Sequence, residues 1–338
     1  MSNLSTVGER PRVRKRARRG ATTGALLATL IAGAVLASCT GTGTDGDDDG
    51  RGQGDGRRDD RTSAPPAGSV LAVKIDNVAA ARPQTGLDAA DIVYAEQVEG
   101  GLSRLMAVYA TRFPEAVGPV RSARESDLEL LRQFEEPTLA FSGAQGKLLP
   151  LIDKAPLRAE TPEDADDAYF RGADKPPPHN LYLRPGELMD SAPGADALTT
   201  GFRRGPAPSG GTPEDSRTVR YPAARFTFTW SGDSRRWQVS MDGRPTVTTD
   251  DVRVAPATVV VQYVTVRESR FHDFLGNNTP YTETVGSGRA EVLRDGKAFE
   301  AGWERKSPTD GTDFTTTNGE PMNFAEGQVW VVYATDTR

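Results

Sequence analysis

The chain has 338 residues, of which 36% are hydrophobic and 26% are charged. This length is sufficient for two domains, and the composition is too polar for a bundle of membrane helices. One cysteine and two histidines exclude a disulfide framework within the chain, a cysteine cluster for a metal ion and a histidine-rich zinc or haem site. We therefore expect neither a metal ion nor a cofactor.

The first 39 residues have the pattern of an export signal. Seven basic residues and one acidic residue precede an apolar run over residues 24–37, which at 14 residues is too short to span a bilayer. The run leads into the motif Leu-Ala-Ser-Cys, which places the only cysteine, Cys39, directly after a small-residue cleavage site. This motif resembles a bacterial lipobox, whose cysteine receives a diacylglyceryl thioether. We predict a lipoprotein signal peptide over residues 1–38 and a lipid on Cys39; a buried free cysteine after an ordinary signal is the alternative.

The part of the chain that follows the predicted signal is acidic. Without residues 1–38 it has 34 basic and 46 acidic residues, a net charge of −12. Such a charge disfavours general binding to nucleic acid or to an anionic membrane surface. We therefore expect no nucleic-acid partner, and we expect the lipid on Cys39 to hold the protein at the extracytoplasmic face of the bacterial cell membrane. The export route, Sec or twin-arginine, is left open.

Residues 39–69 are predicted to be a disordered tether. From residue 40 to residue 68 the chain consists mainly of Gly, Asp, Arg, Thr and Ser, with no aliphatic residue larger than alanine. Such a segment cannot bury enough apolar surface to offset its conformational entropy. A flexible chain of this length has a root-mean-square reach of roughly 30 Å, enough to hold a folded domain clear of the membrane.

Residues 70–195 are expected to form a first domain of mixed α and β structure. Its predicted strands cover residues 70–75, 91–98, 103–112 and 138–142. The second and third strands flank Gly100 and Gly101, and paired glycines permit the positive φ angles of a tight turn. These two strands are therefore predicted to form an antiparallel hairpin.

Helices are predicted at two places in this domain. The first runs from Ser122 to about Phe134, because Ser122 and Glu125 have the spacing of a capping box and apolar residues at helical spacing follow. A second, short helix is expected over residues 146–154. The domain thus combines a hairpin with helices.

Residues 196–217 are predicted to be a linker, because Pro, Gly, Ala and Ser dominate there. Beyond them, residues 218–338 are expected to form a mainly antiparallel β domain. Three turn motifs support this, at Asp242-Gly243, Asp295-Gly296 and Asn318-Gly319. The predicted fold class is therefore α+β, with a mixed α/β N-terminal domain and a β-rich C-terminal domain.

The second of these turns also predicts a register. With a two-residue loop at Asp295-Gly296, Val292 lies opposite Phe299 and Ala290 lies opposite Ala301. These apolar pairs share one face of the ribbon.

Several blocks of the chain resemble one known family. The blocks are Asp76-Asn77, Ala81 to Leu87, Ala90 to Tyr94, Glu99 to Leu105, Gly118 to Arg124, His179 to Tyr182 and Gly286 to Trp303. The resemblance is to the YerB-like family, described as bacterial lipoproteins with two domains of unknown function, and it covers residues 70–338. It implies an exported, lipid-anchored protein and supplies no established catalytic residues.

Arginines near the first predicted helix are the main candidates for a binding site. The candidate ligand-binding residues are Arg82, Glu96, Glu99, Arg104, Arg121, Ser122, Arg124, His179 and Asn180. Arg121 and Arg124 lie at the predicted helix N-terminus, where unpaired N–H groups favour a carboxylate or a phosphate. The alternative is structural, with the arginines paired to Glu96, Glu99 or Glu125.

His179 is the candidate for acid or base chemistry. It follows three prolines, whose rings hold the chain extended and stiff. Beside an acid such as Asp76, Glu96 or Glu99, it could exchange protons with a substrate. A structural turn in which the imidazole is hydrogen-bonded to backbone is the alternative. The chain has no Gly-x-Ser-x-Gly elbow, Walker loop, dinucleotide fingerprint or His-Glu-x-x-His motif, which disfavours the common hydrolase, NTPase and zinc protease classes.

Together these patterns predict a lipid-anchored protein of the cell envelope. A non-catalytic module that binds peptidoglycan, another anionic wall polymer or a partner protein is favoured. The alternative is an envelope hydrolase that uses a carboxylate and His179.

Overall fold

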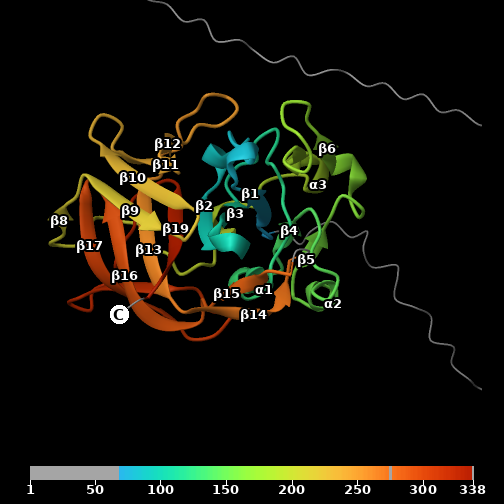
Figure 1. Ribbon diagram of the computed structural model, residues 1–338. Helices are drawn as coiled ribbons and strands as arrows, with labels where there is room; N and C mark the ends of the chain where they lie inside the picture. The colour runs from blue at the N-terminus through green and yellow to red at the C-terminus, as the bar shows by residue number, and fades with distance from the viewer. Residues whose placement is uncertain (1–67, 274–275, 337–338) are drawn as a thin grey trace, which may run out of the picture. The chain divides into compact units, whose positions relative to one another are not determined.

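The computed structural model describes residues 68–273 and 276–336 (Figure 1). The predicted signal peptide, Cys39 and nearly all of the predicted tether lie outside the described residues. Ser69, expected to be in the tether, is 1% exposed, and its hydroxyl donates to the carbonyl oxygen of Glu136 at 2.6 Å. Within the described ranges, no helix has the length and apolar character that crossing a membrane requires.

The first half of the described chain contains short helices and seven strands. The strands are β1 (Leu71–Asp76), β2 (Ile92–Gln97), β3 (Ser103–Tyr109), β4 (Thr138–Ala140), β5 (Arg158–Glu160), β6 (Tyr169–Arg171) and β7 (Leu181–Leu183). The α-helices are α1 (Glu125–Leu131), α2 (Leu149–Ile152) and α3 (Pro185–Leu188). The 3₁₀ turns are η1 (Ala79–Ala81), η2 (Leu87–Ala89), η3 (Glu99–Gly101), η4 (Asp166–Ala168) and η5 (Ala195–Ala197).

The second half of the described chain contains strands only. They are β8 (Thr212–Pro213), β9 (Ser216–Arg220), β10 (Arg225–Ser231), β11 (Arg236–Met241), β12 (Arg244–Pro245), β13 (Thr258–Val264), β14 (Val266–His272), β15 (Asn278–Thr282), β16 (Gly286–Arg294), β17 (Lys297–Arg305), β18 (Asp313–Thr316) and β19 (Val329–Thr335).

Strands from both halves form one main sheet. Its order is β18-β17-β16-β13-β19-β2-β3-β1-β4-β5, and β8 pairs with β17. β19 lies between β13 and β2 and is parallel to both, with Val331 opposite Val260 on one side and Tyr94 on the other. The predicted domains 70–195 and 218–338 therefore share a continuous sheet, and their separate folding stays a prediction.

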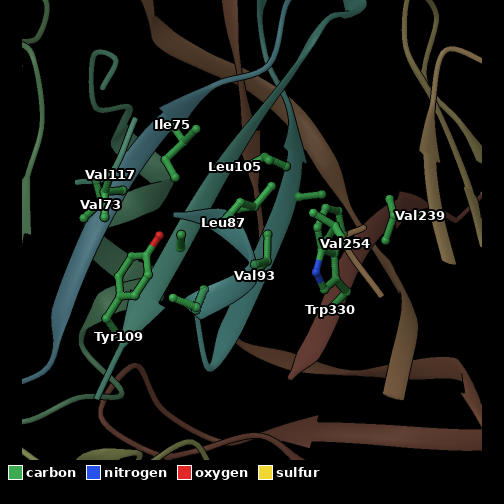
Figure 2. Close-up of a cluster of buried hydrophobic side chains, with 14 of the residues drawn as sticks. Val73, Ile75, Leu87, Val93, Leu105, Tyr109, Val117, Val239, Val254 and Trp330 are labelled. Carbon is green, nitrogen blue, oxygen red and sulfur yellow. The ribbon is translucent and has the colours of Figure 1, made fainter. Parts of the chain in front are cut away.

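One face of the main sheet is covered by a second sheet of order β12-β11-β10-β9. Because successive residues of a strand point to opposite faces, Val93 and Leu105 contribute to this side together with Trp330 of β19. Figure 2 shows this buried cluster, with Val239 of β11 on its far side. The rings of Phe228 and Trp330 pack edge to face, with centroids 5.9 Å apart. This apolar layer joins the two sheets.

The opposite face of the main sheet carries α1. Leu130 and Leu131 of the helix belong to the same buried cluster as Tyr94 and Met106 of the sheet. The ribbon of β14 and β15 lies next to α1 (Figure 1). This face therefore brings the first helix, the β2–β3 hairpin and a ribbon from the second half together.

The fold is richer in strands than the predicted α+β class. The helix expected over residues 122–134 is the seven-residue α1, and the one expected over 146–154 is the four-residue α2. α1 begins late because the backbone before it is committed elsewhere: the N–H of Arg121 donates to Lys74 and that of Ala123 to Gly143. The predicted α/β character of the N-terminal domain is therefore reduced to short helical turns around a sheet.

The capping box predicted at Ser122 and Glu125 is wrong. The backbone N–H of Arg124 donates to Oδ2 of Asp127 at 2.6 Å, and Arg124 precedes the first helical residue. Ser122 instead lies with its hydroxyl 3.4 Å from that of Ser142. The observed cap joins Arg124 and Asp127, which are three positions apart like the predicted pair, but it lies two positions further along the chain.

Most predicted hairpins are confirmed. β2 and β3 pair antiparallel, and Gly100 and Gly101 have φ of 67° and 70°. The turn at residues 295–296 pairs Val292 with Phe299 as expected, and the turn at residues 242–243 joins β11 to β12. At residues 318–319 the loop has three residues rather than two, because the N–H of Thr316 donates to the carbonyl oxygen of Glu320.

Candidate functional site

Charged side chains gather where β1 and β2 end and the antiparallel β3 begins. In this register Arg104 lies between Asp76 on one neighbouring strand and Glu96 on the other. Residues directly opposite in a sheet point to the same face. The acid-base-acid row therefore lies on the face that α1 covers.

We call the ionisable side chains at this edge the charged cluster. Its members are Lys74, Asp76, Glu96, Glu99, Arg104, Arg121, Arg124, Asp127 and His179. Four cationic side chains thus stand against four carboxylates, with one imidazole in addition. Six of the nine predicted ligand-binding residues belong to this cluster.

Lys74 has no exposed surface, and the same is true of its partner Asp127. Its Nζ donates to Oδ1 of Asp127 at 2.7 Å and also to Glu96. Burial lowers the pKa of Lys74 from 10.5 to about 8; the carboxylate of Asp127 opposes this shift, while Arg104 and Arg124 add to it. Lys74 therefore ties β1, β2 and α1 together through buried ion pairs.

Arg124 and Glu99 form a two-pronged ion pair. Nε and Nη2 of Arg124 donate to the two carboxylate oxygens of Glu99 at 2.6 and 2.9 Å. The hydroxyl of Thr279 in β15 donates to the same carboxylate at 2.6 Å. Burial alone would raise the pKa of Glu99, but these donors outweigh it, and the pKa lies below its usual value. Arg124 is therefore paired with Glu99, one of the glutamates named in the structural alternative.

The guanidinium of Arg104 is largely buried, yet it makes few hydrogen bonds. Burial and the neighbouring Arg124 lower the pKa of Arg104 to about 10, and Arg121 contributes in the same direction. Within the described part of the chain, its hydrogen bond is a single one, from Nη1 to the carbonyl oxygen of Ser122 at 3.1 Å. A guanidinium carries five donor hydrogens, so most of those of Arg104 are available.

Arg121 has 26% of its side chain exposed. Its Nε lies 3.2 Å from Oδ2 of Asp76, which makes an ion pair, but this Nε has no hydrogen bond among the described residues. Arg104 and Arg121 are therefore two neighbouring guanidiniums with unused donors beside one carboxylate.

His179 and Asp76 form a direct pair, as the sequence interpretation allowed. Nδ1 of His179 lies 2.8 Å from Oδ2 of Asp76, whose side chain is 3% exposed. Nδ1 is the ring nitrogen that faces the carboxylate, and Nε2 takes no part in this contact. This geometry fits an imidazole that exchanges protons with a bound group.

Three predicted site residues lie outside the cluster. Arg82 donates through Nε and Nη2 to Asn77 and through Nη1 to Asp242 at 2.8 Å, so three of its five donor hydrogens are occupied. The side-chain amide of Asn180 accepts from Nη1 of Arg171 and donates to the carbonyl oxygen of Gly172. The hydroxyl of Ser122 faces that of Ser142. These three contacts are structural.

The helix N-terminus does not provide an anion site. α1 has only seven residues, and its first turn carries the acidic residues Glu125 and Asp127. Asp127 itself accepts the N–H of Arg124 that an anion would have used. The attraction of this region for an anion therefore depends on guanidinium groups rather than on the helix.

Sequence reasoning missed Lys74 and Asp127, which hold the cluster together. The signal for Lys74 was present, because one lysine stands within the apolar run Leu71 to Ile75 and shares its face with Asp76, two residues later. A charged residue at an otherwise buried strand position requires a partner. The partner, Asp127, could not be located from spacing alone.

The ribbon of β14 and β15 is bonded to α1 and to one member of the charged cluster, Glu99. Ser269 donates to Glu125, Thr279 to Glu99, and Tyr281 to Glu129, at 2.7, 2.6 and 3.0 Å.

Within residues 68–273 and 276–336, no group of three or more His, Cys, Asp or Glu side chains is arranged to hold a metal ion.

Comparison with known proteins places both halves of the chain in one family. Residues 56–198 match the N-terminal domain described as "Protein of unknown function (DUF3048)", and residues 217–331 match the C-terminal domain of the same description.

The chain is also similar to a protein of Bacillus subtilis strain 168 named "Putative lipoprotein YerB". The two are 25% identical over 271 residues, which cover 77% of this chain and 80% of the relative. The crystal structure of the Bacillus subtilis YerB protein aligns with a TM-score of 0.65 at 20% identity, over 79% of this chain and 91% of that one. That likeness shows a shared fold.

Proposed function

We propose that this chain, which belongs to the DUF3048 family, is a lipid-anchored protein of the bacterial cell envelope that binds an anionic ligand without catalysis. Anchoring is supported by the Leu-Ala-Ser-Cys motif that ends at Cys39 and by similarity to a relative named as a lipoprotein. A lipid on Cys39 would place the folded part outside the cytoplasmic membrane.

The unused donors of Arg104 and Arg121 carry the proposal of an anion site. Arg121 lies close enough to Arg104 to help lower its pKa, and a second anion beside Asp76 would offset the repulsion between the two guanidiniums. Guanidinium groups bind carboxylates and phosphates through paired, charge-assisted hydrogen bonds. The proposed ligand is therefore a carboxylate or a phosphate of a cell-wall polymer.

Co-sedimentation with purified peptidoglycan, with and without its anionic polymers, tests this proposal. Arg121→Gln is expected to reduce binding by about tenfold or more, because a charge-assisted hydrogen bond contributes roughly 1.5–3 kcal/mol. Arg220→Gln is the matched control, since Arg220 is exposed on β9 and is not a member of the charged cluster. Equal loss in both variants, or none in either, would contradict an anion site at Arg121.

A second function is favoured by the Asp76–His179 pair. An imidazole oriented by a buried carboxylate is a common arrangement for general base catalysis. An envelope hydrolase would use His179 to activate a water or a hydroxyl of the substrate.

The two functions differ in what His179→Ala changes. In a hydrolase this variant would still bind wall fragments but would no longer release products from them, as measured by mass spectrometry of the supernatant. Release by the wild type that is lost in His179→Ala would overturn the binding function in favour of the enzyme.

A further inference from the structure

Two side chains of the charged cluster meet at one oxygen of Asp76. Nδ1 of His179 lies 2.8 Å and Nε of Arg121 lies 3.2 Å from Oδ2, and the carboxylate is buried. The histidine contact is a hydrogen bond, whereas Nε of Arg121 has no hydrogen-bond partner among the described residues. His179 therefore holds Asp76, and Arg121 stands beside the same oxygen in an ion pair alone.

The remaining nitrogens of both side chains can be reached by a ligand. Nη1 and Nη2 of Arg121 and Nε2 of His179 make no hydrogen bond in the part of the chain that the structure describes, yet none of them is fully buried, in contrast to Nε of Arg121. The two side chains are 26% and 20% exposed. An anion that enters beside Asp76 would therefore find donors on two separate segments of the chain.

The charge around Asp76 depends on the protonation state of His179. Arg121 forms an ion pair with Asp76, and Arg104 interacts electrostatically with both. Two guanidiniums and one carboxylate leave one net positive charge with a neutral imidazole and two with an imidazolium. An anion within about 4–6 Å of an ionisable group favours its cationic form, by roughly tenfold or more. Anion binding and protonation of His179 therefore favour each other, because the two equilibria are linked.

The charged side chains on the elements around His179 fall into two groups. Asp76 bonds to the imidazole, and Arg121 and Arg104 act on it through Asp76. The others are engaged with partners of their own: Asp174 with Lys175, Arg171 with Asn180, and Arg82 with Asp242. His179 therefore titrates against one carboxylate and two guanidiniums.

Lys74 also changes charge near neutral pH, but at higher values. Its pKa is about 8, so it loses its proton mainly above that pH. Glu99 stays ionised to lower pH, because its pKa lies below its usual value. Histidine is the side chain whose ordinary pKa lies between pH 5 and 8. A response of the site on the acidic side of the pKa of Lys74 is therefore the signature of a histidine.

We propose that protonated His179 strengthens the anion site at Arg104 and Arg121, so that affinity for an anion rises as pH falls. The imidazolium neutralises Asp76 and leaves the terminal nitrogens of Arg121 to the ligand. A neutral imidazole still holds Asp76, but the site then has one positive charge fewer and binds more weakly. The inference rests on the anion site of the proposed function, to which it adds one residue and a direction of pH dependence.

Calorimetric titration of the full-length protein with sulfate and with formate, from pH 5 to pH 7.5 at constant ionic strength, tests the proposal. Neither probe changes charge in this interval, and the two represent the phosphate and the carboxylate of a wall polymer. The probe that binds more tightly is expected to bind about tenfold more tightly at pH 5 than at pH 7.5. Titrations in buffers of different ionisation enthalpy are expected to show proton uptake on binding.

His179→Gln separates the charge of the residue from its hydrogen bond, because a glutamine amide can donate to Asp76 but does not ionise. This variant is expected to match the wild type at pH 7.5 and to show neither the increase at pH 5 nor the proton uptake. His272→Gln is the matched control, since His272 is the other histidine of the chain, is exposed on β14 and is not a member of the charged cluster. Its pH profile is expected to follow the wild type.

His179→Ala removes both the charge and the hydrogen bond. It is expected to bind about fivefold more weakly than His179→Gln at pH 7.5, because Asp76 is then free to accept from Arg121. Urea unfolding of each variant shows whether it is folded. If neither variant folds, proton uptake by His272→Gln carries the test, since His179 is then the remaining histidine of the chain.

Affinity of the wild type that does not change from pH 5 to pH 7.5, or an increase that persists in His179→Gln, would overturn the role of His179. If Arg121→Gln still weakens binding in that case, the anion site of the proposed function remains. No saturable binding of either probe at any pH would overturn both.

Discussion

Nδ1 of His179 lies 2.8 Å from Oδ2 of Asp76, although 103 positions separate the two residues in the chain. Asp76 ends β1 in the sheet, and His179 follows the proline run, where its N–H donates to the carbonyl oxygen of Pro176 at 2.9 Å. The carboxylate of Asp76 therefore fixes the orientation of the imidazole of His179, which directly follows the three prolines.

Arg124→Gln is expected to destabilise the protein by about 1–3 kcal/mol, because it leaves the carboxylate of Glu99, 8% exposed, without its cation. Arg121→Gln is expected to change the free energy of unfolding by less than about 1 kcal/mol, since Arg121 is partly exposed and Asp76 keeps His179. Urea unfolding of both variants measures the difference. Equal destabilisation would contradict the separate roles given to the two arginines.

Lys74 makes stability depend on pH in an alkaline window. Its pKa is about 8 in the folded state and 10.5 in the unfolded chain, so between these values the unfolded chain binds more protons. The free energy of unfolding that Lys74 contributes therefore rises with pH from 8 to 10.5, by on the order of 3 kcal/mol.

Unfolding of wild type and Lys74→Met from pH 7 to pH 11 measures this contribution as the difference between the two profiles, in which other titrating groups cancel. The variant is expected to be less stable at pH 7, because Glu96 and Asp127 lose their cation. A difference that stays flat across the window would contradict the lowered pKa. If the variant does not fold, the slope of the wild-type profile above pH 8 carries the test.

Cys39→Ala is expected to abolish lipid attachment and to leave an unprocessed precursor, because the thiol is the acceptor of the diacylglyceryl group. Mass spectrometry of the N-terminus measures both the lipid attachment and the processing. An unmodified Cys39, or cleavage at another residue, would show that the Leu-Ala-Ser-Cys motif is not used as a lipobox.

Protease is expected to cut first near Ser209 and Gly210, which are exposed within the predicted linker. Because β19 pairs with β2, the two fragments are expected to stay together on size-exclusion chromatography and to separate only in denaturant. First cleavage within residues 220–330 would contradict the linker, and fragments that separate without denaturant would contradict a strong joint between the halves.

Local patterns predicted the strands and turns well, because alternation and Asp-Gly or Gly-Gly pairs act over a few residues. The register of Val292 with Phe299 followed from the turn alone. The first helix was overestimated because the hydrogen bonds of Arg121 and Ala123 to distant strands compete with helical ones. Such competition is invisible in a local window.

The candidate site could be predicted only in part. Blocks of charged residues indicated which arginines and acids belong together, and Asp76 was among the acids considered for His179. The pairing of Arg124 with Glu99 rather than with Glu125 depends on where the hairpin meets α1. Arg121 and His179 reach the same oxygen of Asp76 from segments more than 40 positions apart, and no sequence spacing reveals this.

The place of β19 in the main sheet has a consequence for biosynthesis. β19 is the latest strand in the described chain, yet it fills the gap between β13 and β2. Until it is in place, each half presents an open strand edge with apolar side chains, which is a template for aggregation. A nascent or truncated chain without Val329–Thr335 would therefore depend on chaperones that hold it unfolded, and folding of the two halves would finish in a single late step.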